Sequence, residues 1–270
     1  MQAVGIINDH ALHCFRREQL ITPALRIEQR SFSAFLLDMD GTLLTSIVAA
    51  ERVWGAWAAR QGLDVAAFLP TIHGMRQVDT IRRLALPGID PDAEAAAITR
   101  AELEDVAGIE AIAGAVAFLA ALPPARWAVV TSAPRALALR RLQAAGLPLP
   151  GLLITAEDVV HGKPAPDCFR LAADRLGVAV EDCLVFEDSP AGVAAAEAAG
   201  ASLLVISATH LQPMATAHPA VEGYGGLSVE SEHTGTLRLR GVATSLQASS
   251  AASTPASSGS DTTSMPAPAG

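Results

Sequence analysis

Residues 35–44 read Phe-Leu-Leu-Asp-Met-Asp-Gly-Thr-Leu-Leu, and this stretch indicates the fold class because an apolar run passes directly into a polar turn. The run 35–37 does not alternate with polar residues, which is typical of a short strand buried on both faces of a parallel sheet. The Asp-x-Asp-Gly-Thr segment 38–42 follows at once. Ligands bind an open parallel sheet at the carboxyl ends of its strands, although two aspartates alone also fit a solvated loop.

Downstream of this stretch, short apolar runs alternate with helical patterns. The runs lie at 127–130, 152–154, 183–186 and 203–206. The helical patterns lie at 134–146, 166–177 and 190–200, each with Pro near its first turn and Gly just past its last. This is the usual asymmetry of helix ends. Strand then helix, repeated, predicts an α/β fold whose core is a Rossmann-like, doubly wound parallel sheet.

One interval between the first two strands breaks this rhythm. Residues 44–111 hold helical patterns of their own, at 48–61, at 77–86, and in a third helix that opens at Asp90-Pro91 as N-cap and first-turn proline. We interpret the interval as an inserted α-helical cap subdomain. A further helix near 113–122 is expected to return the chain to the sheet.

Composition predicts the outer boundaries of the folded unit. Residues 243–270 are mostly Ala, Ser, Thr, Pro and Gly, and such a segment cannot bury enough apolar surface to offset the entropy of ordering. The sequence therefore predicts four parts. They are an N-terminal extension (1–32), an α/β core (33–43 with 112–232), the helical cap (44–111), and a low-complexity, disordered tail (233–270).

Charge and composition exclude several classes of function. The 270 residues include 19 Lys plus Arg against 28 Asp plus Glu, a formal net charge of −9, so no basic footprint for nucleic acid is expected. The longest apolar stretch, 111–125, is shorter than the roughly 18 residues of a membrane span, and no signal peptide is evident at the start. Three cysteines without a Cys-x-x-Cys pair suit a reduced compartment. We expect a cytoplasmic protein with no nucleic-acid or membrane partner.

Polar residues follow the later strands as they follow the first. Thr-Ser at 131–132 comes after the run 127–130, Lys163 after the third strand, and Glu-Asp at 187–188 after the run 183–186. Each alone also fits a helix cap or a surface charge. Because all of them fall at strand ends of one parallel sheet, we predict that they form one site with the Asp-x-Asp segment.

These segments resemble the four motifs of the haloacid dehalogenase-like hydrolase superfamily. The matching residues are Asp38-Met-Asp40-Gly-Thr, Thr131, Lys163 and Glu187-Asp188. The resemblance covers about 33–232, including the cap between the first two motifs. Within the superfamily the sequence looks most like the small sugar-phosphate and polyol-phosphate phosphatases. The segments that suggest this are Ile-His-Gly at 72–74, 127–132, 154–159, 162–167 and 186–192.

The resemblance implies chemistry through an aspartyl-phosphate. Asp38 is expected to attack phosphorus as the nucleophile, and Asp40 to protonate the leaving alkoxide and then to deprotonate water. Thr131 and Ser132 are expected to hydrogen-bond the phosphoryl group, and Lys163 to supply a positive charge.

A count of charges predicts a metal ion. With Asp40 protonated, the negative charges of Asp38 and Asp188 exceed the positive charge of Lys163, so the site would repel a phosphate dianion unless Mg²⁺ is bound. Oxygen ligands suit this ion. By resemblance the ligands are the Asp38 carboxylate, the Asp40 carbonyl and Asp188, and Glu187 stays open as a fourth.

Substrate choice is expected to depend on the cap, because the four motifs contact only the phosphoryl group. His73 and Arg76 lie on either side of Gly74 and are the candidates for contacting the substrate, although Arg76 also fits a solvated helix start. Trp54 and Trp57 fit the buried face of a helix better than a sugar platform.

The sequence thus predicts an Mg²⁺-dependent phosphomonoesterase, acting on a small phosphorylated sugar or polyol through an aspartyl-phosphate. A β-phosphoglucomutase-like phosphotransferase, which shares every motif, and a phosphoglycolate-type phosphatase are the nearest alternatives. A haloacid dehalogenase fits less well, because that reaction has no leaving alkoxide for Asp40 to protonate. A non-catalytic phosphate-binding regulatory protein is the alternative of a different class, and it would not need the second aspartate.

Overall fold

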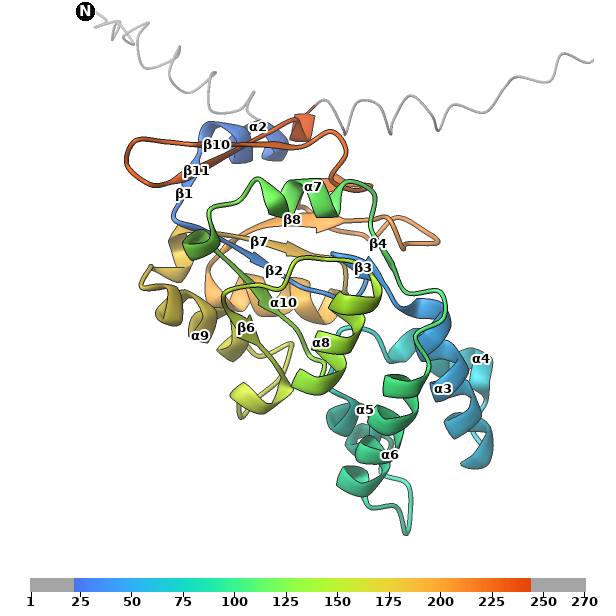
Figure 1. Cartoon of the computed structure of the whole chain (residues 1–270). Helices are drawn as coiled ribbons and strands as arrows, with labels where there is room; N and C mark the ends of the chain where they lie inside the picture. Colours follow the sequence, from blue (N-terminus) through green and yellow to red (C-terminus); the bar gives the residue numbers. More distant parts are fainter. Residues whose placement is uncertain (1–21, 244–270) are drawn as a thin grey trace, which may run out of the picture.

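A six-stranded parallel sheet forms the centre of the computed structural model, which describes residues 22–243 (Figure 1). Its strand order is β6-β5-β2-β7-β8-β9, and all neighbours pair in parallel. The strands are β2 (Ala34–Leu37), β5 (Trp127–Val130), β6 (Leu153–Ile154), β7 (Cys183–Glu187), β8 (Ser202–Ile206) and β9 (Ala220–Val221). The predicted α/β fold with a parallel core is confirmed.

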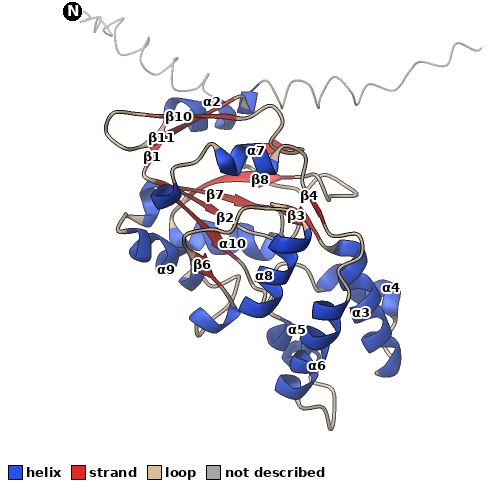
Figure 2. Ribbon diagram, in the orientation of Figure 1, coloured by secondary structure: helices blue, strands red, loops and turns tan. Residues whose placement is uncertain are grey.

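Helices cover both faces of this sheet (Figure 2). The side chains of α7 (Ala115–Ala120) and α8 (Arg135–Ala144) share one hydrophobic cluster with Phe35 and Leu37 of β2. Those of α9 (Asp167–Leu176) and α10 (Pro190–Ala199) share a second cluster with Ala34 and Leu36. Successive residues of a strand point to opposite faces, so the apolar run of β2 contributes to both cores.

Residues 44–111, here called the helical insertion, have a hydrophobic cluster of their own. Leu44–Thr45 (β3) pairs antiparallel with Glu110–Ala111 (β4), so the insertion begins and ends at one place. Between them lie α3 (Ile47–Arg60), α4 (Val65–Phe68), α5 (Gln77–Leu84) and α6 (Pro91–Glu104). Trp54, Trp57 and Phe68 pack together in this cluster. As predicted, Asp90 caps α6, since its carboxylate accepts the N–H of Asp92 at 3.0 Å.

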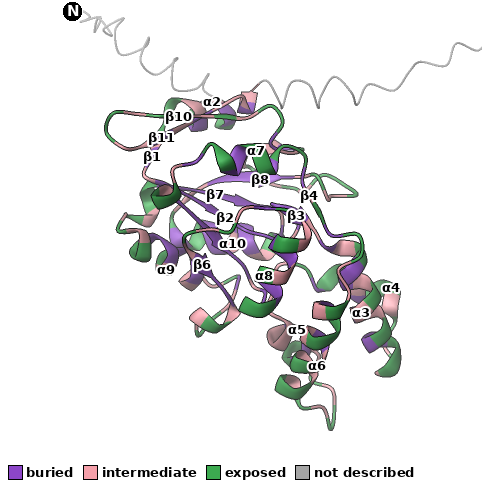
Figure 3. Cartoon of the chain, in the orientation of Figure 1, coloured by how far each residue is buried: buried purple, intermediate pink, exposed green. Residues whose placement is uncertain are grey.

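A third sheet shows that the predicted end of the core was wrong. The sheet has the order β1-β11-β10, from Ser31–Phe32 (β1), Leu237–Arg240 (β11) and Ser228–Ser231 (β10). Leu237, Leu239 and Val242 are fully buried against the main core. Figure 3 shows that buried residues also make up the central strands β2, β7 and β8. The folded chain therefore extends past 232, because the alternation Leu-Arg-Leu-Arg places two leucines on one face.

The predicted N-terminal extension also overlaps the folded part of the chain. Helix α2 (Pro23–Gln29) begins at Thr22, whose hydroxyl accepts the N–H of Leu25, and it buries Ala24 and Ile27. The remainder of the extension and of the tail, 1–21 and 244–270, lies outside the described residues. Short 3-10 turns occur at Leu69–Thr71, Pro124–Arg126, Ala156–Asp158 and Val180–Asp182. Within residues 22–243, none of the helices has both the length and the apolar character needed to span a membrane.

Candidate active site

The predicted motif residues gather where β2, β5 and β7 end. The β2–β7 ladder extends one residue past β2, as the N–H of Asp38 donates to the Phe186 carbonyl at 3.0 Å. The chain then turns at Gly41, which has a φ of +88°. A Cβ at Gly41 would collide with the Asp188 carboxylate, so only glycine lets the Asp38 loop and the Asp188 loop approach this closely.

Lys163 is buried among acceptors at the centre of the site. Its ammonium donates to Asp38 Oδ1 at 2.5 Å, Glu187 Oε1 at 2.7 Å and the Val130 carbonyl at 3.2 Å. Only 1% of the residue is exposed. Three acceptors satisfy all three N–H donors of the ammonium, so its charge is fixed beside Asp38.

Glu187 holds both this lysine and the loop that follows β7. Its Oε2 accepts the N–H groups of Asp188 and Ser189 at 2.7 and 2.8 Å and the Ser189 hydroxyl at 3.1 Å. The Ser189 hydroxyl in turn caps α10, accepting the N–H of Gly192 at 3.0 Å. A Cβ at Gly192 would overlap the Glu187 carboxylate. The first turn of α10 therefore encloses the Glu187 side chain.

Three carboxylates converge beside this lysine. Asp38, Glu187 and Asp188 each offer an oxygen within 4.8 Å of the others. Burial raises the pKa of Asp38 to about 8, although the Lys163 ammonium opposes this rise. Burial, together with the charges of Glu187 and Asp38, holds the pKa of Asp188 well above its usual range. One lysine does not balance these charges, and clustered carboxylate oxygens fit a hard divalent cation.

Asp40 has surroundings of a different kind. Its side chain is 27% exposed. Its Oδ1 accepts the Ser46 hydroxyl at 2.6 Å and is ion-paired with the Arg141 guanidinium at 2.9 Å. Arg141 was not among the site residues predicted from the sequence. The sequence did contain a hint of its burial. Arg141 follows Leu137 by four residues and Ala138 by three, so it lies on the same helix face as these two buried residues of α8.

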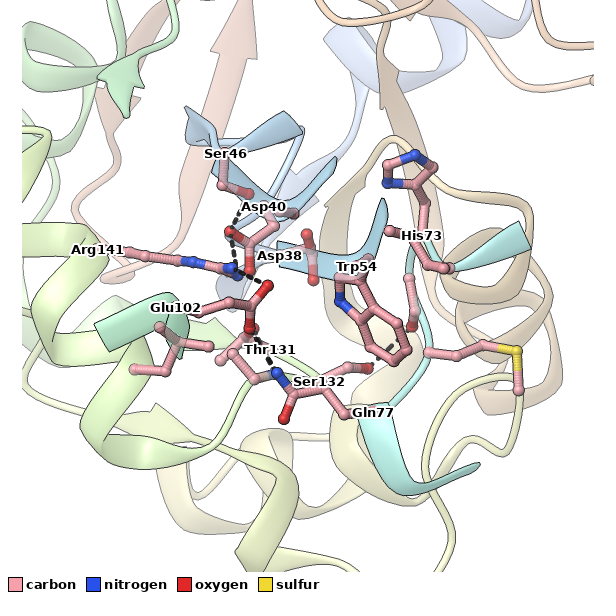
Figure 4. A pocket seen from close by; sticks show the side chains of 16 residues that line it. Asp38, Asp40, Ser46, Trp54, His73, Gln77, Glu102, Thr131, Ser132 and Arg141 are labelled. Carbon is pink, nitrogen blue, oxygen red and sulfur yellow. Dashed lines mark hydrogen bonds and ion pairs between the residues drawn. The ribbon is translucent and has the colours of Figure 1, made fainter. Parts of the chain in front are cut away.

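Sheet and insertion line one cavity together (Figure 4). Its lining includes Asp38, Asp40, Ser46, Trp54, His73, Gln77, Glu102, Thr131, Ser132 and Arg141. The buried Thr131 hydroxyl accepts the N–H of Ala133 at 3.0 Å. The Ser132 hydroxyl donates to the Gly74 carbonyl of the insertion at 2.9 Å. The predicted phosphate-binding residues 131–132 therefore lie at the junction of sheet and insertion.

The two predicted substrate contacts lie in different places. His73 lines the cavity, and burial lowers its pKa. Arg76 does not line this cavity but a second hollow that Gln77 and Ser132 also border. Its guanidinium contacts the Asp79 carboxylate at 2.6 Å and the Val159 carbonyl at 3.1 Å. Trp54 is 4% exposed and forms part of the cavity wall, so the predicted buried helix face also borders the site.

The fold and this site define an enzyme class with a Rossmann-like parallel α/β core, an inserted helical segment and a carboxylate cluster at the strand ends. The family model for haloacid dehalogenase-like hydrolases matches residues 32–200. The chain belongs to that family.

Known proteins similar to this chain include phosphatases. The chain is 41% identical to hexitol phosphatase A of Escherichia coli over 178 residues, 64% of this chain and 82% of that protein. It is 32% identical to glycerol-1-phosphate phosphohydrolase 2 of Saccharomyces cerevisiae over 196 residues, 66% of this chain and 75% of that protein. A solved structure of a hydrolase from Pseudomonas syringae matches with a TM-score of 0.58 and 26% identity, covering 65% of this chain and 84% of that one.

Proposed function

We propose that the chain hydrolyses phosphomonoesters of small sugars or polyols. The observation that carries this proposal is the pair of carboxylates at the end of β2, one enclosed beside Lys163 and the other facing the cavity beside Arg141. The names of the two similar phosphatases, which refer to hexitol and glycerol phosphates, support the substrate class.

Asp38 and Asp40 divide the reaction between them. An oxygen of Asp38 attacks phosphorus, the bond from phosphorus to the alcohol oxygen breaks, and Asp40 gives that oxygen its proton. Asp40 then takes a proton from water, which attacks phosphorus and releases Asp38 and inorganic phosphate. The hydroxyl of Thr131 and the Ser132 backbone bind phosphoryl oxygens, and the ammonium of Lys163 supplies a fixed positive charge beside Asp38.

The carboxylate cluster is suited to hold Mg²⁺. Asp38 and Asp188, with the Asp40 carbonyl, are the proposed ligands. Both oxygens of Glu187 already accept hydrogen bonds, so we assign this residue to holding Lys163 and the following loop. When bound, the ion supplies positive charge that offsets the buried carboxylates and the phosphate dianion.

The helical insertion acts as the cap over the phosphoryl site and contributes the residues that contact the alcohol. Of its cavity-lining side chains, His73 has ring nitrogens that can pair with the hydroxyls of a polyol. Arg76 contacts the loop before Lys163 and seats the insertion on the core. The cytoplasmic location and the absence of a nucleic-acid partner stay predictions.

Phosphate release from a panel of phosphorylated sugars and polyols, with Mg²⁺ and with chelator, tests the proposed function. We expect stoichiometric phosphate and free alcohol in the presence of Mg²⁺ only. Isomerised sugar phosphate without phosphate release would identify a phosphotransferase instead. Ligand binding without turnover on any ester would identify a regulatory protein.

We predict that Asp38→Asn lowers kcat more than a hundredfold and leaves the fold unchanged, because an amide of similar shape cannot attack phosphorus. Steady-state phosphate release measures the loss, and circular dichroism with thermal melting checks the fold. Single catalytic groups contribute about 10² to 10⁴ in rate. A loss of less than a hundredfold would mean that Asp38 only binds the metal or substrate.

A further inference from the structure

Arg141 joins the sheet to the helical insertion through one guanidinium. It lies on α8, and its side chain is only 7% exposed. One terminal nitrogen lies 2.9 Å from Asp40 Oδ1, and the other lies 3.0 Å from Glu102 Oε1 near the end of α6 (Figure 4). A guanidinium is a rigid planar fork, so the position of Glu102 is linked geometrically to that of Asp40.

The Glu102 carboxylate is itself held in place by two helices of the insertion. Its Oε2 accepts the Gln77 amide at 2.5 Å, and the Gln77 carbonyl accepts the Thr99 hydroxyl at 2.6 Å. Glu102 is 3% exposed. The order Asp40, Arg141, Glu102, Gln77, Thr99 thus leads from the catalytic loop to the interior of the insertion, with every side chain oriented by the next.

Because the Arg141 guanidinium is buried, its ion pairs depend on the insertion being packed against the sheet. The Nε of Arg141 has no hydrogen-bond partner among residues 22–243, so the two carboxylates provide its ionic contacts. A buried charge that loses one partner is costly. If the insertion moves away from the sheet, Glu102 leaves with it and Arg141 keeps Asp40 alone.

The contacts of Asp40 show which of its oxygens is left for chemistry. Ser46, at the start of the insertion, and Arg141 both contact Oδ1. Within the described part of the chain, none of the hydrogen bonds falls on Oδ2. With Oδ1 held in this way, Oδ2 is the oxygen that stays available to the leaving group.

We propose that Arg141 is a positioning residue for Asp40 and that Glu102 of the insertion positions Arg141 in turn, so that the acid is aligned only when the insertion is seated. This inference rests on the proposed function, in which Asp40 protonates the leaving group. The proton moves from Asp40 Oδ2 to the alcohol oxygen as its bond to phosphorus breaks, and Arg141 itself exchanges no proton.

The dependence of rate on the leaving group tests this role. Glycerol 1-phosphate needs a proton on its alkoxide, whereas p-nitrophenyl phosphate has a good leaving group and needs little assistance. We expect Arg141→Met to lower kcat about a hundredfold on the alkyl ester, within the range of general acid catalysis, and by less than about threefold on the aryl ester. Arg141→Lys should recover part of the alkyl activity, because it restores the charge without the fork.

Arg140 provides a matched control on the same helix. Its Nε donates to the Leu103 carbonyl of the insertion at 3.5 Å, and no contact joins it to Asp40 in the described residues. Arg140→Met removes a guanidinium between α8 and the insertion, and we expect the ratio of alkyl to aryl kcat to stay unchanged. A ratio that falls as far as in Arg141→Met would mean that any contact between helix and insertion has this effect, and would overturn the proposal.

Two double variants separate positioning from folding. Arg141→Met leaves the Glu102 carboxylate buried without its cation. The double variant Glu102→Gln with Arg141→Met removes both charges, and we expect this double variant to show the same selective loss of activity on the alkyl ester. Arg141→Met added to Asp40→Asn should cost no further alkyl activity, since the two residues act as a unit. Equal losses on both esters, or additive losses in the second pair, would overturn the inference.

The activities of all these variants on the alkyl and aryl esters are compared with those of Asp40→Asn. If Asp40→Asn does not lose more on the alkyl ester than on the aryl ester, the proposed role of Asp40 fails. If it does and Arg141→Met does not, the positioning role alone fails and the proposed function stands.

Discussion

Asp38 and Asp40 are two residues apart, yet their surroundings suit them to different tasks. Asp38 is 5% exposed and lies against a buried lysine and two further carboxylates. Asp40 borders the cavity and contacts a hydroxyl and a guanidinium. A nucleophile needs a fixed position next to positive charge, and an acid-base group needs access to substrate and water. The local contacts therefore agree with the proposed division of roles.

We predict that His73→Ala changes the ranking of sugar and polyol phosphates by kcat/KM, whereas Arg76→Ala lowers activity on all of them alike. His73 lines the cavity, while Arg76 contacts Asp79 and the Val159 carbonyl. A lost polar contact to one substrate costs about 1 kcal/mol or more for that substrate only. Competition assays with pairs of substrates measure the ranking. A ranking changed by Arg76→Ala would return that residue to the list of substrate contacts.

The pH dependence of stability reports on Glu102. Burial raises its pKa from 4.5 to about 6, although Arg141 and Gln77 oppose the rise. The folded state therefore binds a proton more tightly than the unfolded state, and the contribution of Glu102 to stability is lost as pH rises from about 4.5 to about 6. The loss is about 2 kcal/mol at 1.36 kcal/mol per pKa unit.

Denaturant unfolding of the wild type and of Glu102→Gln at several pH values measures this effect. The difference in free energy of unfolding, wild type minus variant, should fall by about 2 kcal/mol across that interval and stay flat above it. A difference that grows with pH would show that the attraction of Arg141 outweighs the cost of burial.

Among the helices, α10 contains the tightest fit at the site. Gly192 lies in its first turn, where a Cβ would overlap the Glu187 carboxylate. We predict that Gly192→Ala destabilises the protein by about 2 kcal/mol or more, since displacing Glu187 disturbs a buried charge network. It should also lower activity, because Glu187 holds Lys163. Chemical denaturation and phosphate release measure the two effects.

Gly55 of α3 is the matched control. Its added Cβ would meet Val65 Cγ1 at 3.6 Å, an ordinary contact. Gly55→Ala should be neutral or stabilising by up to about 1 kcal/mol, from helix propensity alone. Equal effects of the two substitutions would show that the Glu187 side chain has room to move.

The elements that sequence predicts well are those with one dominant local signal. Strands β2 and β5 are wholly apolar, and β7 and β8 are apolar except for Glu187 at the end of β7 and Ser202 at the start of β8. Proline and glycine mark the ends of α10. Strand β11 was not predicted, because its alternating Leu and Arg lie directly before a low-complexity segment. The place of Arg141 in the site was not predicted, because it depends on a contact with Glu102, 39 residues away. No local sequence pattern shows such a pair.

The three-stranded sheet β1-β11-β10 joins the two ends of the described chain and packs against the main core. We predict that a chain ending after Ala243 melts within about 2 °C of the full chain, because 244–270 offers little apolar surface. A chain ending after Gly235 loses Leu237, Leu239 and Val242, all fully buried. At roughly 1.5 to 3 kcal/mol for each of these three buried side chains, the shorter chain should lose about 5 to 9 kcal/mol of unfolding free energy. Calorimetry of both chains measures the difference, and equal melting temperatures would show that β11 contributes no stability.

The pairing of β1 with β11 has a consequence for folding during translation, because the ribosome makes the chain from its N-terminus onward. Arg238 donates to the Ser31 hydroxyl across 207 positions of sequence, and Arg240 and Ala243 contact Glu28 of α2. The apolar side of α2 and β1, with Ala24, Ile27 and Phe32, is synthesised long before β11, the strand that covers it. Contacts between distant parts of a chain form slowly, and uncovered apolar surface attracts other chains. The nascent polypeptide therefore exposes the apolar side of α2 and β1 until β11 has been synthesised, and we expect a chaperone to bind this surface.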